Sequence, residues 1–309
     1  MIIRVDAGLA GERADKIVAM LAEVSRSVAR RLIETGAAQV DGSPVAPRDR
    51  LDVGAMVSID LPATETLEPE EVAFEVRYED ADVAVVDKPA GIVVHPGTGV
   101  MGGTLAGGLL FRWPQIRGIG QENRWGIVHR LDRDTSGLLM VALTEAAYEG
   151  LTAAIAAHEV SRTYLALVQG GFALPGGTID APIGRDPRRP TRRVVRREGR
   201  PARTHYRRLA GWNDRGVSLL EVRLETGRTH QIRVHLESIG HPVIGDRVYG
   251  APNPRMSSVE RIWLHAVSLS FAHPVTGATI DVTAPLPSDL QSTLEELGSA
   301  DVGGYPKNT

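Results

Sequence analysis

Residues 126–144 read GIVHRLDRDTSGLLMVALT, and the interpretation of the rest of the chain depends on this stretch. Two apolar runs, 126–131 and 138–143, flank the polar segment DRDTSG at 132–137. Short polar side chains bond neighbouring backbone groups in turns, and glycine accepts a positive φ. The pattern therefore predicts two strands joined by a tight, charged connection.

The charged connection contains a carboxylate between two cations. Arg130 and Arg133 bracket Asp132 at the edge of a continuous apolar run. Guanidinium groups nearby favour the charged form of a carboxylate. A positioned carboxylate can act as a nucleophile, so Asp132 is a candidate catalytic group. An ordinary solvated turn would explain the turn residues but not the two arginines.

Composition places the chain among ordinary globular proteins. It has 309 residues, enough for one large or two medium domains, with 42% hydrophobic and 24% charged residues. No apolar run approaches the ~20 residues of a membrane span, and the N-terminus lacks the apolar segment of a signal peptide. Cysteine is absent, so disulfides and thiolate metal sites are excluded. We expect a cytoplasmic protein that does not contact membranes.

Charge is distributed unevenly. The net charge is only −3, but residues 65–82 hold eight acids against one arginine. Residues 185–208 hold eleven arginines against two acids. Prolines and glycines exclude a long helix there, which predicts a projecting hairpin or loop. Such a density of arginine repels itself unless a polyanion neutralises it, so this segment indicates nucleic-acid binding.

The N-terminal 62 residues predict a small separate domain. Two short helices are expected within residues 12–35, followed by a hairpin at 38–40 with the turn Asp41-Gly42 and a strand at 56–61. Arg26, Arg30 and Arg31 form a basic face on the second helix. The acidic, Pro-containing residues 63–75 are expected to form a linker.

The remaining elements alternate in type. We expect a helix at 145–158, strands at 162–168 and 217–224, a helix at 229–239 with Thr229 as N-cap, strands at 264–272 and 279–283, a short helix, and a flexible tail at 298–309. Arg228 would lie at the mouth of the 229–239 helix, where its guanidinium could meet a carboxylate in fork geometry.

A glycine pattern at 97–102 satisfies the dinucleotide fingerprint G-x-G-x-x-G. His95-Pro96 interrupts the approach from the preceding strand, and the following TLAGGLLFRW is a poor helix because Gly107 and Gly108 lie inside it. We therefore expect no nucleotide cofactor.

Three long motifs carry a family resemblance. HRLDRDTSG (129–137), DVAVVDKPAGIVVHP (82–96) and LETGRTHQIRVHLESIGHPVIGDRVYG (224–250) resemble the RluA/RluD family of pseudouridine synthases, in the family's order, from about Val83 to Pro285. The two N-terminal helices and the VDG turn resemble an S-four-type RNA-binding domain. The resemblance implies an α+β catalytic domain at 76–297 on a largely antiparallel mixed sheet, the pseudouridine synthase fold, preceded by a small α/β RNA-binding domain at 1–62.

The resemblance also implies roles for particular residues. Asp132 would do the chemistry, Arg228 would pair with it, and Tyr164 would be the active-site tyrosine. The family often has lysine where this chain has Arg162. Substrate contacts are implied for Arg130, Ile232, His129 and Thr135. RNA contacts are expected from Arg26, Arg30, Arg31, Arg188, Arg189, Arg192, Arg193, Arg196 and Arg197. No metal or organic cofactor is implied.

The function predicted is the isomerisation of specific uridines in RNA by base flipping, with the chain acting as a monomer. Asp132 would attack ribose carbon 1′, add to the base, or take a proton from carbon 2′; the residues do not choose among these. Large-subunit ribosomal RNA is the expected target and transfer RNA the alternative.

Two other functions are compatible with parts of the sequence. A metal-dependent RNA hydrolase could use His129, Asp132, His230 and His235, but the last two lie ~140° apart around a helix and would not share an ion. A non-catalytic RNA-binding protein would leave the Asp132 turn and Arg228 without a purpose.

Overall fold

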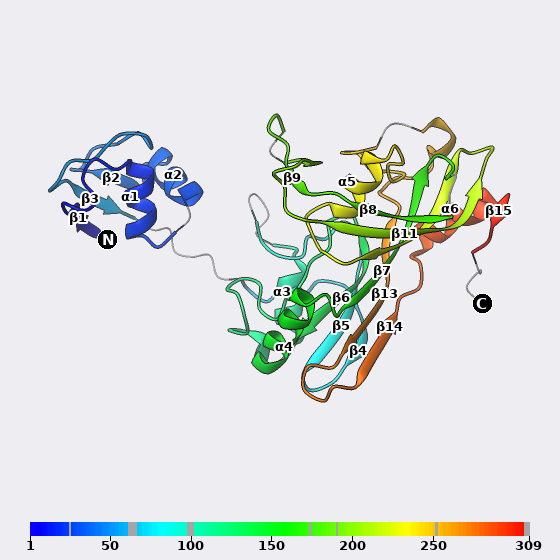
Figure 1. The fold of residues 1–309 in the computed structure, drawn as a ribbon. Helices are drawn as coiled ribbons and strands as arrows, with labels where there is room; N and C mark the ends of the chain where they lie inside the picture. Colours follow the sequence, from blue (N-terminus) through cyan, green and yellow to red (C-terminus); the bar gives the residue numbers. More distant parts are fainter. Residues whose placement is uncertain are drawn as a thin grey trace. The chain divides into compact units, whose positions relative to one another are not determined.

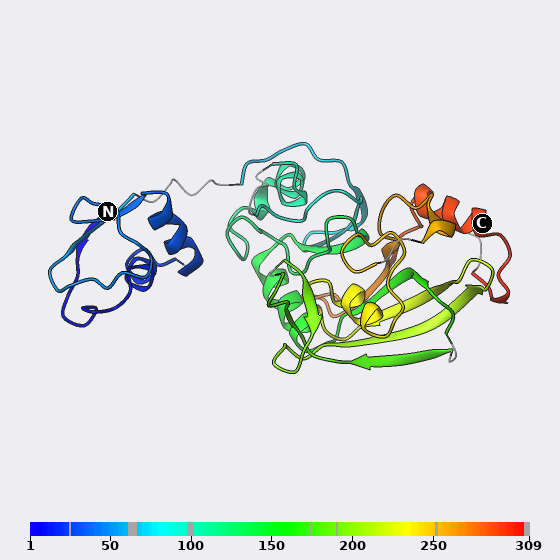
Figure 2. The same cartoon turned by 90° about the horizontal axis from the view of Figure 1, so that it is seen from above.

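A computed structural model describes residues 1–24, 26–60, 67–97, 102–172, 175–189, 191–250 and 253–305. The chain divides into two compact units, Met1–Thr66 and Leu67–Thr309. Figures 1 and 2 show the elements of each unit from two directions. None of the helices in the described part of the chain is long and apolar enough to cross a membrane.

The first unit packs two helices on a small sheet. Its three strands are antiparallel in the order β1-β3-β2. Ile17, Leu32 and Val57 are among the buried residues of its core. The two predicted helices and the predicted hairpin are confirmed. The elements are β1 (Ile2–Arg4), α1 (Ala14–Leu21), α2 (Arg26–Glu34), β2 (Ala38–Val40) and β3 (Met56–Ile59).

The second unit is built on a ten-stranded sheet with the path β15-β11-β12-β7-β13-β6-β5-β4; β14 pairs with β13 and β8 with β11. Every pairing is antiparallel except β13 with β6, so the predicted α+β fold with a largely antiparallel mixed sheet is confirmed. The strands are β4 (Glu75–Glu79), β5 (Val83–Lys88), β6 (Ser136–Ala142), β7 (Ser161–Gln169), β8 (Gly176–Asp180), β11 (Arg203–Trp212), β12 (Val217–Leu224), β13 (Leu264–Ala272), β14 (Thr279–Thr283) and β15 (Val302–Gly303).

A separate two-stranded hairpin lies in the arginine-rich segment. Strands β9 (Ile183–Arg185) and β10 (Arg193–Val195) pair antiparallel, as the prolines and glycines there predicted. We call residues 183–200 the arginine hairpin.

Helices cover both faces of the ten-stranded sheet. Successive side chains of a strand point to opposite faces, so neighbouring residues pack against different helices. Leu139 of β6 packs under helix α3 (Leu105–Arg112), and Met140 packs with helix α4 (Glu145–Ala156) on the other face. Further along the sheet, α5 (Gln231–Ser238) and α6 (Ser288–Leu297) cover opposite faces of β7 and β12. Two short 3-10 helices, η1 (Pro114–Ile116) and η2 (Pro254–Met256), complete the unit.

The only parallel pairing among the described strands of the sheet fixes the start of β6. His265 and Ala266 of β13 pair with Ser136 and Gly137. Gly137 has φ 115°, and a Cβ there would lie against the backbone of Ala266. Glycine is therefore required where β6 leaves the Asp132 turn and meets β13.

Residues 126–131 differ from the prediction of a regular strand. A single bridge, Ile127 to Val141, is their only strand-like pairing. The side chains of this run face a cavity described below. Apolar residues that line a cavity and those of a core strand give the same pattern, which is why the prediction was wrong.

Helix α3 was also missed. Thr104 caps it by accepting a hydrogen bond from the Gly107 amide at 3.2 Å. A Cβ at Gly108 would lie 2.8 Å from Cβ of Val72, so the glycine that weakens the helix permits close packing of residues 68–74 against it. Residues 98–101 of the glycine fingerprint lie outside the described part of the chain.

Two segments expected to be irregular are tied to the second unit where they are described. Leu67, in the expected acidic linker, is buried in the core beneath α3, and the Glu70 amide donates to the Gly107 carbonyl at 3.1 Å. In the expected flexible tail, Val302 and Gly303 pair with β11 as an edge strand.

Candidate active site

The turn that carries Asp132 is held in place by hydrogen bonds to its backbone. The Thr135 amide donates to the Asp132 carbonyl at 3.2 Å, which closes the turn. The Arg133 carbonyl accepts from the Gly91 amide at 2.9 Å and from Nζ of Lys88 at 3.0 Å. The backbone next to Asp132 is therefore fixed to the end of β5.

Lys88 is fully buried and supplies all three of its ammonium hydrogens to carbonyl groups. Besides Arg133, it donates to Pro89 at 2.8 Å and to Ile92 at 2.9 Å. Burial lowers the pKa of Lys88 to about 7, and the charges of Asp134 and Asp132 oppose that shift.

An arginine bridges Asp132 to a second carboxylate. Nη1 of Arg233 donates to Oδ2 of Asp132 at 2.9 Å, while its Nε and Nη2 hold Asp246 in a fork at 2.7 and 2.9 Å. Burial opposes the charge on Arg233, but the bonds to Asp246 and the charges of both carboxylates raise its pKa above the ordinary value. Asp246 is fully enclosed and also accepts the amides of Val248 and Tyr249.

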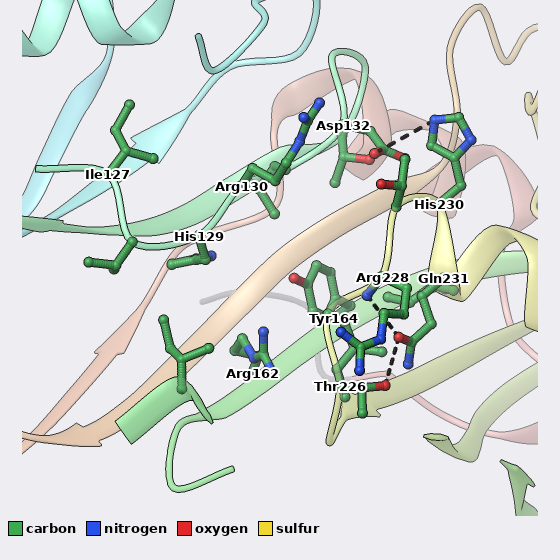
Figure 3. Close-up of a pocket in the computed structure, with 18 of the residues that line it drawn as sticks. Ile127, His129, Arg130, Asp132, Arg162, Tyr164, Thr226, Arg228, His230 and Gln231 are labelled. Atoms are coloured by element: carbon green, nitrogen blue, oxygen red, sulfur yellow. Dashed lines mark hydrogen bonds and ion pairs between the residues drawn. The ribbon is translucent and has the colours of Figure 1, made fainter. Parts of the chain in front are cut away.

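The other carboxylate oxygen of Asp132 is open. Among the described residues it accepts no hydrogen bond, and Nε2 of His230 lies 3.9 Å from Oδ1, which is beyond hydrogen-bond distance (Figure 3). The side chain of Asp132 is 19% exposed. One oxygen is thus held and the other faces the cavity.

His230 is neutral and fixed by a tyrosine. Burial lowers the pKa of His230, and the charge of Asp132 opposes that shift. Nδ1 of His230 lies 2.9 Å from the Tyr249 hydroxyl, which accepts from the Arg193 amide at 2.8 Å. The hydroxyl has its own proton free to donate to Nδ1, an arrangement that places the ring proton on Nε2, the nitrogen nearer Asp132.

Helix α5 has its N-cap one residue later than predicted. His230 has φ 58°, in the left-handed region, so Thr229 is not the N-cap. Instead Oε1 of Gln231 accepts from the Arg228 amide at 3.0 Å and from the Thr226 hydroxyl at 2.8 Å. Figure 3 shows these bonds below Asp132.

The shift of the helix start changes which arginine meets Asp132. Nε of Arg228 donates to the Pro201 carbonyl at 3.0 Å, and the described residues give it no contact with Asp132. The expected pairing of Arg228 with Asp132 is therefore corrected to Arg233, one turn further along the helix, although Arg228 lines the same cavity.

Asp132 opens onto a cavity of about 590 Å³. Tyr164 and Ile232, both almost fully buried, form part of its wall, as Figure 3 shows for Tyr164. Burial raises the pKa of Tyr164; the charge of Arg162 opposes that shift and the charge of Asp132 adds to it. The phenol is therefore neutral, and its ring can stack on a planar group.

The other expected substrate contacts line this cavity too. Arg130 is exposed at the mouth, where Nη1 lies 3.4 Å from Nε2 of His95. Thr135 is buried, and Oγ1 has no hydrogen-bond partner in the described chain. His129 accepts the Met140 amide on Nε2 at 2.9 Å, so its ring is fixed.

The predicted RNA-binding arginines fall into two groups. On the arginine hairpin, Arg192 and Arg196 contact Glu237 and Glu198, and the backbone of Arg193 is bonded to Tyr249. Arg188, Arg189 and Arg197 are exposed, and no carboxylate of the described residues forms an ion pair with their guanidinium groups, although the backbone amides of Arg188 and Arg189 donate to Asp186.

In the first unit, Arg26 contacts Asp15 at 2.8 Å and Arg30 contacts Glu34 at 2.7 Å, and both remain more than half exposed. Arg31 is exposed on the same helix. These three arginines present a cationic surface on α2.

The residues weighed as a metal site are not brought together. Both ring nitrogens of His235 are engaged, with Thr204 at 2.8 Å and the Ala181 carbonyl at 2.9 Å. Across the described ranges, the one group of three or more His, Asp or Glu side chains close enough to share an ion is Asp80, Asp82 and His273. Those three do not line the Asp132 cavity.

Arg233, Asp246 and Lys88 were not singled out from the sequence. Arg233 follows the buried Ile232 inside an amphipathic helix, a weak signal for a charged group turned inward. Lys88 ends the strand VAVVDK, directly after an apolar run and Asp87. This is a stronger signal, because lysine is seldom fully buried without a partner.

Comparison with known proteins agrees with this geometry. Residues 82–238 match the RNA pseudouridylate synthase family and residues 12–57 match the S4 domain. An RNA pseudouridine synthase of Chloroflexus aurantiacus is 47% identical over 291 residues, which cover 93% of this chain and 90% of that protein. The ribosomal large subunit pseudouridine synthase D of Xanthomonas campestris is 43% identical over 302 residues, 93% and 89% of the two chains.

A solved structure has a fold similar to that of this chain. Human RNA pseudouridylate synthase domain containing 1 superposes with a TM-score of 0.58 at 29% identity, covering 73% of this chain and 90% of that one.

Proposed function

The chain belongs to the RNA pseudouridylate synthase family and isomerises uridine to pseudouridine in RNA, and we propose that it does so with Asp132 on uridines of large-subunit ribosomal RNA. The target is proposed because relatives that match most of this chain are named ribosomal large subunit pseudouridine synthase D.

One observation supports Asp132 above all others. Arg233, which is itself held by Asp246, donates to Oδ2, while Oδ1 is left open toward a cavity with an aromatic wall. A carboxylate that is rigid on one side and free on the other is placed to react with a nucleotide that enters the cavity.

The reaction requires the target base to leave its stack. Tyr164 and Ile232 would pack against the flipped base, and Arg130 at the mouth would hold a neighbouring phosphate. Neutral His230 would donate from Nε2 to the substrate or to Asp132. The glycosidic bond between N1 and ribose carbon 1′ breaks, the base turns, and carbon 5 bonds to carbon 1′; carbon 5 then loses its proton to solvent and N1 takes one up.

Asp132, Tyr164 and Arg233, which line the cavity, all come from the second unit of one chain. We therefore infer that the enzyme works as a monomer. Because its proposed substrate is ribosomal RNA, the compartment that we propose for the enzyme is the cytoplasm.

Tritium release tests the activity. Ribosomal RNA transcribed with uridine tritiated at carbon 5 should lose tritium to water when incubated with the protein and a chelator. Release that stops with chelator would favour a metal-dependent reaction, and RNA binding without release would favour a non-catalytic protein.

The target is tested separately by mapping pseudouridine across ribosomal and transfer RNA in cells with and without the gene. Loss of signal at large-subunit positions is expected. Loss confined to transfer RNA would contradict the proposed target while leaving the activity intact.

Removing the first unit, Met1–Thr66, should weaken RNA binding while leaving chemistry in place, because the residues proposed to act on uridine belong to the second unit. We expect a higher KM, with kcat at saturating RNA within about threefold of the full chain. The control is the full chain with Arg26→Ser and Arg31→Ser, which should show a smaller rise in KM. A folded truncation without turnover at any RNA concentration would contradict this division.

The arginine hairpin should contribute to the salt dependence of binding. Replacing Arg188, Arg189 and Arg197 by serine removes three exposed cations, so the log–log slope of affinity against salt should flatten by about 2 to 3. Arg112→Ser, a surface arginine paired with Glu79, is the control and should leave the slope unchanged. An unchanged slope in the triple variant would mean that RNA does not contact these arginines.

A further inference from the structure

A second cationic group lies deep in the Asp132 cavity. Arg162 lines the cavity and is only 5% exposed. It lies two residues before Tyr164 on β7, so the two side chains share a face of the strand about 7 Å apart. Figure 3 shows Arg162 and Asp132 on opposite sides of Tyr164.

The guanidinium of Arg162 is largely unused by the protein. Nη2 donates to the Glu225 carbonyl at 3.2 Å. Among the described residues, Nε is buried without a hydrogen-bond partner, and the only hydrogen bond of the guanidinium is the one from Nη2, so Nη1 makes none. No carboxylate of the described residues pairs with it. A buried cation left with free donors is costly unless something else accepts from them.

The absence of a side chain at Gly227 leaves space for this guanidinium. A Cβ at Gly227 would lie 2.9 Å from Nη1 of Arg162. Gly227 is in the loop between β12 and α5, which also lines the cavity. A larger residue there would displace the guanidinium.

His129 adds a second donor to the same cavity. Its Nε2 accepts the Met140 amide, so the neutral ring carries its proton on Nδ1. Burial and then the charge of Arg162 lower the pKa of His129 to about 3, so the ring stays neutral. Both groups offer hydrogen-bond donors.

A carbonyl oxygen of a flipped base suits these donors better than a phosphate. The base is the part of a flipped nucleotide that enters the cavity, while its phosphates stay with the strand. In uracil, C4 lies directly across the ring from N1. When N1 and its bond to ribose face Asp132, O4 points to the opposite side, where Arg162 lies.

We propose that Arg162 is a specificity-determining residue that donates a hydrogen bond to O4 of the flipped uracil; this rests on the proposed function of the Asp132 cavity. Cytosine carries an amino group at this position, and two donors would then face each other, so the contact selects uracil.

The same contact serves the product. When the freed base turns so that carbon 5 bonds to the ribose, C2 lies across the ring from the new bond. O2 then takes the place of O4, and Arg162 holds a carbonyl oxygen before and after the turn.

The test pairs Arg162→Met with an altered base. A synthetic RNA carrying the uridine found by the mapping experiment is prepared with uridine, 4-thiouridine or 2-thiouridine at that position. Sulfur is a much weaker acceptor than oxygen, so wild-type kcat/KM should fall about tenfold with 4-thiouridine. Arg162→Met should lower kcat/KM on uridine RNA by about 10- to 100-fold, and 4-thiouridine should add less than about threefold to that loss.

The comparison separates O4 recognition from other roles. An intrinsic effect of sulfur on the reaction appears in both enzymes and cancels. Arg162→Lys keeps a cationic donor and should retain a 4-thiouridine effect. Arg112→Met, at a surface site, should behave as wild type with all three RNAs. The 2-thiouridine RNA should couple to Arg162 less strongly than the 4-thiouridine RNA.

Equal losses on all three RNAs would overturn the proposal. If those losses came with a flatter salt slope, Arg162 would contact a phosphate; if with a lower melting temperature, it would be structural. Absence of turnover by wild type on uridine RNA would instead count against the proposed target.

Discussion

Asp132→Asn should reduce turnover by at least about 10³-fold, which corresponds to about 4 kcal/mol in the barrier. The change keeps the size of the side chain and an oxygen that can accept from Arg233, but it removes the charge from the atom that faces the cavity. An amide is a poor nucleophile and a poor base, so each of the three proposed mechanisms is blocked.

The measurement is single-turnover tritium release at saturating RNA, with RNA affinity and thermal unfolding measured in parallel. Affinity and folding should be close to wild type, because Arg233 keeps its fork to Asp246. Turnover within about tenfold of wild type, which is ~1.4 kcal/mol in the barrier, would contradict the assignment of Asp132 as the catalytic residue.

Asp134→Asn is the matched control. Asp134 lies two residues on in the same turn, its side chain is exposed, and its carbonyl, not its carboxylate, contacts Arg261. We expect turnover within about threefold of wild type.

Strand positions were predictable where apolar side chains point to a helix-covered or sheet-core surface on the faces of the sheet and the run is bounded by turns. Strands 217–224, 264–272 and 279–283 agree with β12, β13 and β14, because their apolar runs end at clear turn signals. The run at 126–131 failed for a physical reason. Its apolar side chains line part of a cavity, and the sequence does not distinguish residues of a cavity wall from residues of a paired strand.

The identity of the Asp132 partner depends on where a helix begins, and that could not be read from spacing. Thr229 looks like an N-cap, which would put Arg228 at the helix mouth beside a carboxylate. The left-handed conformation of His230 makes that residue the N-cap and moves the helix start by one residue, while the side chain of Gln231 accepts from the Arg228 amide. The predicted partner of Asp132, Arg228, was therefore wrong, and Arg233 contacts Asp132 instead.

Arg233→Lys should lower kcat on the order of 10²-fold, although the substitution keeps the charge. Arg233 uses three nitrogens at once, two on Asp246 and one on Asp132. A lysine has one nitrogen and cannot hold both carboxylates in this geometry. Oδ2 of Asp132 would lose its anchor, and the position of Oδ1 in the cavity would be free to vary.

Stability must be measured with activity, because weakening a buried ion pair can cost about 3 to 5 kcal/mol. A variant that is folded at the assay temperature, with a lower melting temperature and a low kcat, fits the bridge. Arg228→Lys is the comparison: it keeps its charge and loses only a bond to the Pro201 carbonyl, so kcat should stay within about tenfold of wild type. If instead Arg228→Lys fell 10²-fold and Arg233→Lys did not, the arginine that supports Asp132 during the reaction would be Arg228, and the Arg233 bridge would serve folding alone.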